Sequence, residues 1–471
     1  MKNFFNKLLP GNLYIWLAYF GLLIISIICL FSASSTLVAK QGSAAAPIMR
    51  HITFLMLGFI SIIVLQKFST QFIRYVMGYG LLIVSWILLV LAMFIGEVKG
   101  GATRSLWGIQ PSELARLALI ISTASFMAKC QDAEFLKAKF HWFVVMFVIT
   151  LALVVPSNLS TTILLAFTIF VMLFIGRIPW RYIFKLLLIS GGLFVGYISV
   201  SLVVVNIYPV SKEAPSWTRV FRRVETWQAR VVNFSSAINS KTDKNVKNPY
   251  EISDEEGINN RQSTYALIAI ARGGLTGVGI GDSNQKNFLP EAYSDFIFAI
   301  ICEESGLVGL CFIFGFYIFL FYKVVTAIYK SKNLFHIYMS AGCMVIMITQ
   351  ILVHCLVCLN LFPLTGQPLP LISNGGSSIV INSIYIGIFI YTSRQWKFIS
   401  NTAGDKNNIA SDGVDKNDAK FDINNPAVPL EEQNNAADNI GVEIVSEMDI
   451  DDAYSTEKKD STDNSVTIEI E

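Results

Sequence analysis

Residues 295–321 read DFIFAIICEESGLVGLCFIFGFYIFLF, and this stretch decides the fold. Its apolar run is long enough to cross the hydrocarbon core of a membrane as a helix. Asp295 stands at the edge of the run, and Glu303 and Glu304 lie about two helical turns further in. A carboxylate at the rim of a hydrocarbon layer is costly unless water, a cation or a substrate compensates it, so Asp295 is a candidate functional residue. Alternatively, Ser294 and Asp295 are helix N-caps, whose side-chain oxygens accept hydrogen bonds from first-turn amides.

Apolar runs of similar length recur along the chain. Hydrophobic residues make up 53% of it, charged residues only 15%, and the mean hydropathy is +0.54, which is typical of a membrane protein. The further runs cover residues 13–31, 51–66, 76–96, 112–128, 140–155, 159–176, 183–205, 337–359 and 376–396. The sequence therefore predicts an all-α polytopic membrane protein with ten transmembrane helices.

The basic residues indicate how these helices are oriented. With the N-terminus inside, most Lys and Arg residues of the short connections fall on the inner side, and the short outer loops hold only Lys40, Arg50, Lys99 and Arg104. The positive-inside rule then predicts that both termini are cytoplasmic. By parity, residues 206–294 form a large extracytoplasmic loop between helices 7 and 8.

The charge balance divides the chain at about residue 400. Residues 401–471 hold 18 Asp/Glu against 5 Lys/Arg, although the whole chain carries only +2. The segment has few aromatic residues and cannot bury enough apolar area to offset the cost of ordering. We therefore expect a membrane domain over residues 1–400 and a disordered acidic cytoplasmic tail over 401–471.

A second pair of charges falls within the predicted span 112–128. Glu113 and Arg116 are three residues apart, so they share one face of a helix and are able to form an ion pair near its outer end. Pro111 suits the first turn of this helix, and Ser112 suits a cap. The pair is either a structural ion pair or part of a functional site.

Two stretches of the outer side are rich in glycine. Residues 273–281 read GGLTGVGIG, which favours a tight, non-helical turn and does not fit the dinucleotide-binding pattern. Residues 365–378 read TGQPLPLISNGGSS, and non-helical backbone at membrane depth must be buried in protein or line a watery cavity. The hydroxyls of Ser377 and Ser378 are therefore candidates for binding an anionic head group, or they merely begin the last helix.

Other outer residues are candidates of lower rank. Lys286 and Glu291 are charged residues close before Asp295. Residues 217–234 alternate apolar and basic positions, which predicts an amphipathic helix whose arginines meet lipid phosphates, or a helix with one solvated face.

The seven cysteines and four histidines show no metal-binding spacing, so we expect no protein-bound transition metal. The cysteines all fall in or beside apolar segments. The pair Cys355 and Cys358 therefore indicates core packing rather than a redox motif.

Five stretches together resemble the signature stretches of the SEDS family, the FtsW and RodA type of membrane proteins in bacterial division and elongation. They are, in order, QPSELA (110–115), GGLTGVGIG (273–281), QK (285–286), LPEAYSDFIF (289–298) and LPLISNGGSS (369–378). The resemblance runs from Leu13 to Arg394, excludes the acidic tail, and is closer to the FtsW type.

This resemblance implies a peptidoglycan glycosyltransferase of the bacterial inner membrane that polymerises lipid II on the outer face. It also implies a class B penicillin-binding protein as the cross-linking partner, further divisome proteins, and no nucleic acid. The catalytic aspartate of the family motif corresponds to Asp295. Glu113, Arg116, Lys286, Glu291, Ser377 and Ser378 are then expected to bind the substrate or its diphosphate. A divalent cation, Mg²⁺ or Mn²⁺, would come with that diphosphate rather than with a protein site.

Four positions depart from the family pattern, one of them Ser160, which replaces a glycine. Arg116 replaces the usual lysine, which keeps the charge but removes a group able to act as a base. Asn158 replaces an acidic residue, and Asn374 replaces a tyrosine, so any role of these two positions is in doubt. Two other functions stay open, namely a lipid II flippase and a non-catalytic divisome scaffold.

Overall fold

The computed structural model describes residues 9–33, 45–95, 97–99, 102–106, 108, 110–207, 221, 223–242, 258–289 and 292–411. The chain divides into two compact units, Met1–Thr402 and Ala403–Glu471. Of the second unit only residues 403–411, the end of a helix, are described. Residues 401–411 of the predicted disordered tail are thus helical, and the predicted disorder of residues 412–471 lies outside the described part. Everything below concerns the first unit.

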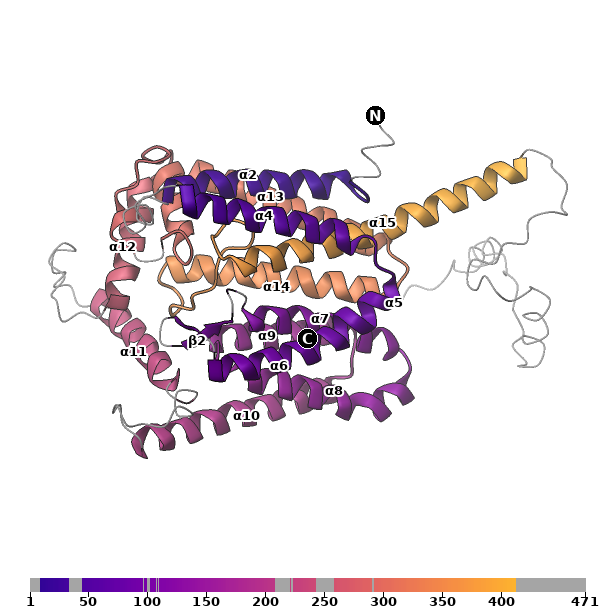
Figure 1. Ribbon diagram of the computed structural model, residues 1–471, viewed down its shortest axis with the longest axis horizontal. Helices are drawn as coiled ribbons and strands as arrows, with labels where there is room; N and C mark the ends of the chain where they lie inside the picture. Colours follow the sequence, from indigo (N-terminus) through magenta and orange to yellow (C-terminus); the bar gives the residue numbers. More distant parts are fainter. Residues whose placement is uncertain are drawn as a thin grey trace, which may run out of the picture. The chain divides into compact units, whose positions relative to one another are not determined.

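The first unit is a bundle of helices (Figure 1), and each predicted span overlaps one of them. The helices are α2 (Leu13–Ala33), α4 (Ala45–Leu65), α5 (Thr70–Phe72) continued by the π-helix η1 (Ile73–Gly80) and α6 (Leu81–Ile95), α7 (Pro111–Lys129), α8 (Ala133–Val154), α9 (Leu159–Ile175), α10 (Trp180–Ile207), α13 (Ile297–Lys330), α14 (Leu334–Cys358) and α15 (Ser377–Ser411). Within the described residues, seven helical segments are long and apolar enough to cross a membrane. The number of crossings, the side of the termini and the side of the large loop stay predictions.

The fold is not purely helical. Strands β1 (Glu97–Lys99) and β2 (Ala102–Ser105) pair as an antiparallel hairpin between α6 and α7, so the described residues are mostly helical, as predicted, with one short hairpin added. Gly100 and Gly101 stand between the strands, and a Gly-Gly pair is a strong signal for a two-residue hairpin turn. The strands themselves, of three and four residues, are too short to stand out in the sequence as strands.

Helix α7 lies at the centre of the bundle. It packs against η1, α6, α8, α9 and α14, and sixteen of its nineteen residues are buried. A helix surrounded in this way has no lipid-facing side, so its polar residues must find partners within the protein. The Glu113–Arg116 pair therefore lies in the interior of the protein.

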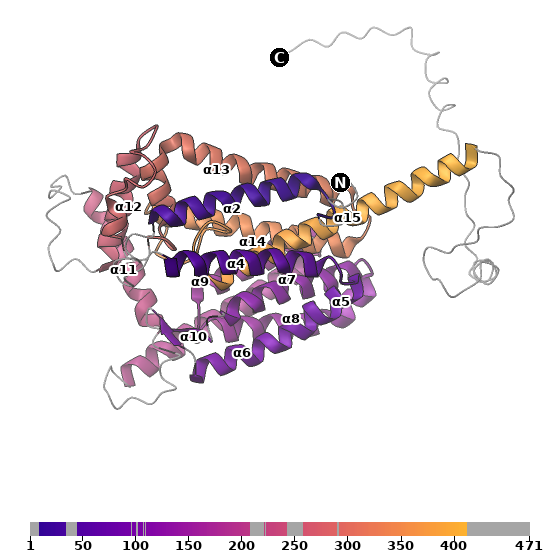
Figure 2. The same cartoon turned by 45° about the horizontal axis from the view of Figure 1, so that its top comes forward.

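Two helices, α11 (Arg223–Thr242) and α12 (Ile258–Gly273), run along one end of the bundle in both views (Figures 1 and 2). We call this the α12 end. The predicted amphipathic helix over 217–234 thus begins later, at Arg223, and residues 217–220 lie outside the described part. Val224 is buried, and Trp227 packs edge-on against Phe194 of α10. Arg230 donates to the carbonyl of Leu364 at 3.0 Å, so this arginine contacts the protein, and the contact of the arginines with lipid phosphates stays a prediction.

Helix α13 is broken at Gly306, and the glycine loop, residues 273–281, forms hydrogen bonds with the backbone groups that the break leaves without helical partners. Gly306 has φ +61° and ψ −163°, a conformation available essentially only to glycine. An unbroken helix would join the amides of Leu307 and Val308 to the carbonyls of Glu303 and Glu304. Here these four groups bond to the glycine loop instead. The pairs are Leu307 N to Gly274 O (3.1 Å), Val308 N to Leu275 O (3.1 Å), Val278 N to Glu303 O (3.0 Å) and Gly279 N to Glu304 O (3.0 Å).

Candidate functional site

Asp295 lies in a turn that leads into α13, at the α12 end of the bundle. The helix begins only at Ile297, and its N-cap, Phe296, makes no side-chain hydrogen bond. The prediction that Ser294 or Asp295 caps the helix is therefore wrong. The Ser294 hydroxyl donates to Oδ1 of Asp295 at 3.2 Å instead, and Asp295 is partly exposed. The Asp295 carboxylate therefore belongs to the turn before α13 and does not cap that helix.

The connecting loop, residues 359–376 between α14 and α15, holds this turn in place. The Ser373 hydroxyl donates to the carbonyl of Ser294 at 2.8 Å, and the Asn374 amide donates to the carbonyl of Tyr293 at 3.1 Å. Leu371 adopts φ +65°, which costs a non-glycine residue about 1–3 kcal/mol and persists only where the surroundings enforce it. The connecting loop is thus a strained, fixed support for Asp295.

The start of α15 brings Glu113 to the same end of the bundle. The hydroxyls of Ser377 and Ser378 lie next to the Glu113 carboxylate, and the amide of Gln110 donates to Ser377 Oγ at 3.4 Å. Pro111 occupies the first turn of α7 as predicted. The predicted Ser112 cap is wrong, because the N-cap is Gln110 and the Ser112 hydroxyl has no partner within the described residues.

Glu113 and Arg116 form the predicted ion pair, at 3.7 Å between Oε1 and Nη2. The Arg116 side chain is fully buried, donates to Oε1 of Gln350 at 3.5 Å and lies 6.0 Å from the centre of the Tyr385 ring. Within the described residues, Glu113 Oε2 and Arg116 Nε and Nη2 have no hydrogen-bond partner. Such atoms are sites for buried water or for a ligand group. Arg116 itself has no exposed surface in this state.

Glu303 and Glu304 have partners of their own, apart from Arg116. Glu303 is completely buried and pairs with Arg272 at 3.1 Å, and it also accepts a hydrogen bond from the Ser283 hydroxyl. Glu304 accepts from the Ser32 hydroxyl of α2. Both carboxylates lie beside the end of the glycine loop, since Glu303 accepts from Ser283 and Glu304 neighbours Gly281.

Lys286 is buried, and its ammonium group donates to the carbonyl of Gly281 at 2.6 Å. In this state it supports the segment after the glycine loop rather than facing open space. Glu291 lies outside the described residues. The connecting loop thus binds the Asp295 turn through Ser373 and Asn374, and the residues that follow it, Ser377 and Ser378, lie next to Glu113. Lys286 is held on the glycine-loop side.

Several buried polar residues of the site were missed in the sequence. His51 of α4 contacts both Ser26 and Asn374, at 3.0 and 3.3 Å. His354 of α14 bonds to the carbonyl of Gln367 at 2.8 Å, and the Gln367 amide donates to Thr161 at 3.0 Å. Each is a polar residue within or beside an apolar run, and that signal would have found them.

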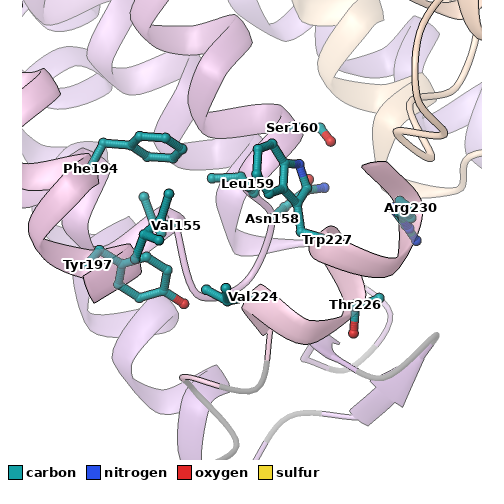
Figure 3. A pocket seen from close by; sticks show the side chains of 11 residues that line it. Val155, Asn158, Leu159, Ser160, Phe194, Tyr197, Val224, Thr226, Trp227 and Arg230 are labelled. Carbon is teal, nitrogen blue, oxygen red and sulfur yellow. The ribbon is translucent and has the colours of Figure 1, made fainter. Parts of the chain in front are cut away.

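A pocket opens beside the connecting loop, where α9 begins (Figure 3). Phe194 and Tyr197 of α10 lie on one side, and Trp227 of α11 lies on the other, with Val155 between them (Figure 3). The polar lining groups are Asn158, Ser160, Thr226 and Arg230. An aromatic and aliphatic pocket with a few polar groups suits an amphipathic molecule.

No three His, Cys, Asp or Glu residues gather as a metal site anywhere in the described ranges. The expectation of Mg²⁺ or Mn²⁺ bound with a substrate diphosphate stays a proposal.

Comparison with known proteins gives consistent similarities. Residues 12–397 match the FtsW, RodA and SpoVE family model, described as cell cycle protein. A relative from Aliivibrio salmonicida (strain LFI1238), called a probable peptidoglycan glycosyltransferase FtsW, is 30% identical over 82% of this chain and 89% of its own. A relative of the same description from Coxiella burnetii is 26% identical over 80% of this chain and 94% of its own.

Solved structures share the fold. A chain from a peptidoglycan synthase complex that coordinates polymerization and crosslinking aligns with a TM-score of 0.57 and 20% identity, over 82% of this chain and 99% of its own. The Thermus thermophilus rod shape determining protein RodA aligns with a TM-score of 0.54 and 21% identity, over 82% of this chain and 97% of its own.

Proposed function

The chain belongs to the FtsW, RodA and SpoVE family of cell cycle proteins, and we propose that it is a peptidoglycan glycosyltransferase that polymerises lipid II during cell division. It is a multi-pass membrane protein. The observation that carries the proposal is the position of Asp295, a partly exposed carboxylate in a turn that the connecting loop fixes by two hydrogen bonds. The bacterial inner membrane, with the site on its outer face, is part of the same proposal.

In the proposed reaction, Asp295 is the general base. It takes the proton from the 4-hydroxyl of an acceptor GlcNAc while that oxygen attacks C1 of a donor MurNAc. The new C–O bond forms as the bond from C1 to the diphosphate oxygen breaks, so polyprenyl diphosphate leaves and the configuration at C1 inverts. One carboxylate is enough, because a diphosphate leaves without protonation if its charge is neutralised, unlike the leaving group in glycoside hydrolysis.

The neighbouring residues have supporting roles in this proposal. Ser377 and Ser378, next to Glu113, are the candidates for contacting the diphosphate, with Glu291 as a further candidate. Arg116 neutralises Glu113 from the interior and adds positive potential without touching the substrate. Lys286 is buried and supports the glycine-loop side. A Mg²⁺ or Mn²⁺ ion bound to the diphosphate would add the remaining charge neutralisation.

The pocket between α9, α10 and α11 is the proposed site for the apolar chain of a lipid-linked substrate. Its aromatic lining suits a polyprenyl group, and Arg230 at its rim donates to Leu364 of the connecting loop. The same loop continues to Ser373 and so to the Asp295 turn. A class B penicillin-binding protein is the proposed partner, in line with the synthase complex to which the fold is similar.

The test uses the purified full chain, with its partner, and labelled lipid II. Asp295→Asn keeps the size of the side chain and is expected to lower the polymerisation rate by about 100-fold or more, since a general base contributes on that order. Asp132→Asn is the matched control, because Asp132 is an exposed cap of α8 and an amide caps equally well. Undiminished polymer from Asp295→Asn would contradict the assignment of the base.

The same preparation separates the alternative functions. Lipid II scrambling in vesicles by a parent protein that forms no polymer would favour the flippase. Neither polymer nor scrambling, with retained binding of the partner, would favour the scaffold.

A further inference from the structure

His51 of α4 has no role in the proposed reaction so far. Its side chain lies between α2 and the connecting loop. It is 1% exposed. Its Nε2 lies 3.0 Å from the hydroxyl of Ser26, and its Nδ1 lies 3.3 Å from the side-chain oxygen of Asn374. Both ring nitrogens therefore have partners, as an enclosed imidazole requires. No sequence motif pointed to this residue.

The hydrogens of this chain of contacts can be assigned. The Ser26 hydroxyl donates its one hydrogen to the carbonyl of Ile372 at 2.9 Å. Ser26 Oγ is therefore the acceptor from His51, and Nε2 carries a hydrogen. A neutral ring then accepts at Nδ1 from the amide group of Asn374, after rotation of that amide, and a protonated ring donates to its oxygen. Whether neutral or protonated, the His51 ring forms hydrogen bonds with both Ser26 and Asn374.

Ile372, which Ser26 contacts, and Asn374, which His51 contacts, flank Ser373 in the connecting loop. Ser373 donates to the carbonyl of Ser294, and the backbone amide of Asn374 donates to the carbonyl of Tyr293. The residue before Ile372 is Leu371, whose positive φ requires enforcement by its surroundings. His51 thus acts, through Ser26 and Asn374, on the segment that fixes the Asp295 turn.

We infer that His51 is a positioning residue, which holds residues 372–374 through Asn374 and Ser26 and thereby sets the place of Asp295. This inference rests on the proposed function for its catalytic consequence. Its structural part, the immobilisation of residues 372–374 by the ring, does not depend on that function.

A matched pair of substitutions separates the two contacts. The side-chain amide of asparagine reaches the position of Nδ1, and that of glutamine reaches the position of Nε2. His51→Asn therefore keeps the contact to Asn374 and loses Ser26, whereas His51→Gln keeps Ser26 and loses Asn374. Because Asn374 lies directly over the Asp295 turn, His51→Gln is expected to lower kcat by on the order of 100-fold with little change in KM. His51→Asn is expected to retain most of kcat.

Asn374→Ala completes the design. It removes the same contact from the other side, so the double variant with His51→Gln is expected to lose no more activity than either single variant. Hydrogen exchange provides a readout without catalysis. The backbone amides of Ile372, Ser373 and Asn374, which are all hydrogen-bonded, are expected to exchange faster in His51→Gln than in His51→Asn.

The outcomes are distinct. Equal losses of kcat and of thermal stability in His51→Asn and His51→Gln would overturn the inference, because they would indicate general packing. Wild-type kcat and exchange in His51→Gln would overturn it as well. If the parent forms no polymer, the proposed function fails, and the exchange pattern alone then decides for or against His51.

Discussion

The Glu113–Arg116 pair shows that a buried carboxylate in this protein needs a cation and hydrogen-bond donors close to it. Both side chains lie on the central helix α7, and the carboxylate has a cation at 3.7 Å and two hydroxyls beside it. Breaking a buried ion pair by removing one partner is strongly destabilising, whereas removing both charges is often close to neutral. The pair therefore serves first to make Glu113 tolerable at the site.

We expect Arg116→Gln to destabilise the protein by about 3–5 kcal/mol, because Glu113 is then left buried without a cation. The double variant Glu113→Gln with Arg116→Gln is expected to regain much of that loss. Arg116→Lys keeps the charge and serves as the matched control. The measurement is the thermal midpoint, in one detergent, of the parent, Arg116→Gln, Glu113→Gln, the double variant and Arg116→Lys. A double variant that is as unstable as the sum of the singles would contradict the coupling.

The sequence predicted Asp295 and the Glu113–Arg116 pair because charges in apolar runs stand out locally. It did not predict that Ser294 fails to cap α13, since Ser373 and Asn374 compete for the same turn from about 80 residues away. Contacts of that kind depend on how the helices pack, which no local pattern contains.

At the scale of elements, the broken helix α13 is the feature that most limits substitution. A Cβ at Gly306 would lie against the backbone of Gly277 and Leu275, and its φ and ψ are close to forbidden for any other residue. The four hydrogen bonds across the break depend on that close approach. Glycine at this position is therefore a requirement of the element.

Gly306→Ala is expected to lower the thermal midpoint clearly, since backbone strain of about 1–3 kcal/mol adds to the steric overlap. It is also expected to reduce polymerisation, because the glycine loop leads to Lys286 and on to Asp295. Gly315→Ala on the same helix is the control, as a Cβ there meets nothing within 4 Å. An unchanged midpoint in Gly306→Ala would show that the break is not needed.

The ranges of the apolar helices could be predicted closely, because hydropathy over a membrane-length window is a local property. The glycine-rich sequence 273–281 likewise predicted a tight turn, and Gly274, Gly277, Gly279 and Gly281 all have positive φ. The pairing of this turn with α13 could not be predicted. The unpaired backbone groups of each segment are satisfied only when the two segments meet in the fold, and no local pattern shows that they do.

At the scale of the whole molecule, the connecting loop joins regions that are far apart in sequence. It meets α11 through Leu364, α9 through Gln367, the Asp295 turn through Ser373 and α4 through Asn374. All these partners belong to the unit Met1–Thr402, and the family match ends at residue 397. The proposed site is therefore built from residues of this unit.

Deletion of residues 412–471 is expected to leave both the thermal midpoint and the polymerisation rate of the purified protein unchanged. The segment 401–471 has 18 Asp/Glu against 5 Lys/Arg and too few apolar residues to contribute a core. The assay compares the parent, the deletion, and a chain in which Asn and Gln replace the acidic residues of the tail. Slower polymerisation by the deletion alone would indicate that the tail acts by its presence. Slower polymerisation by both variants would indicate that its charge regulates the site.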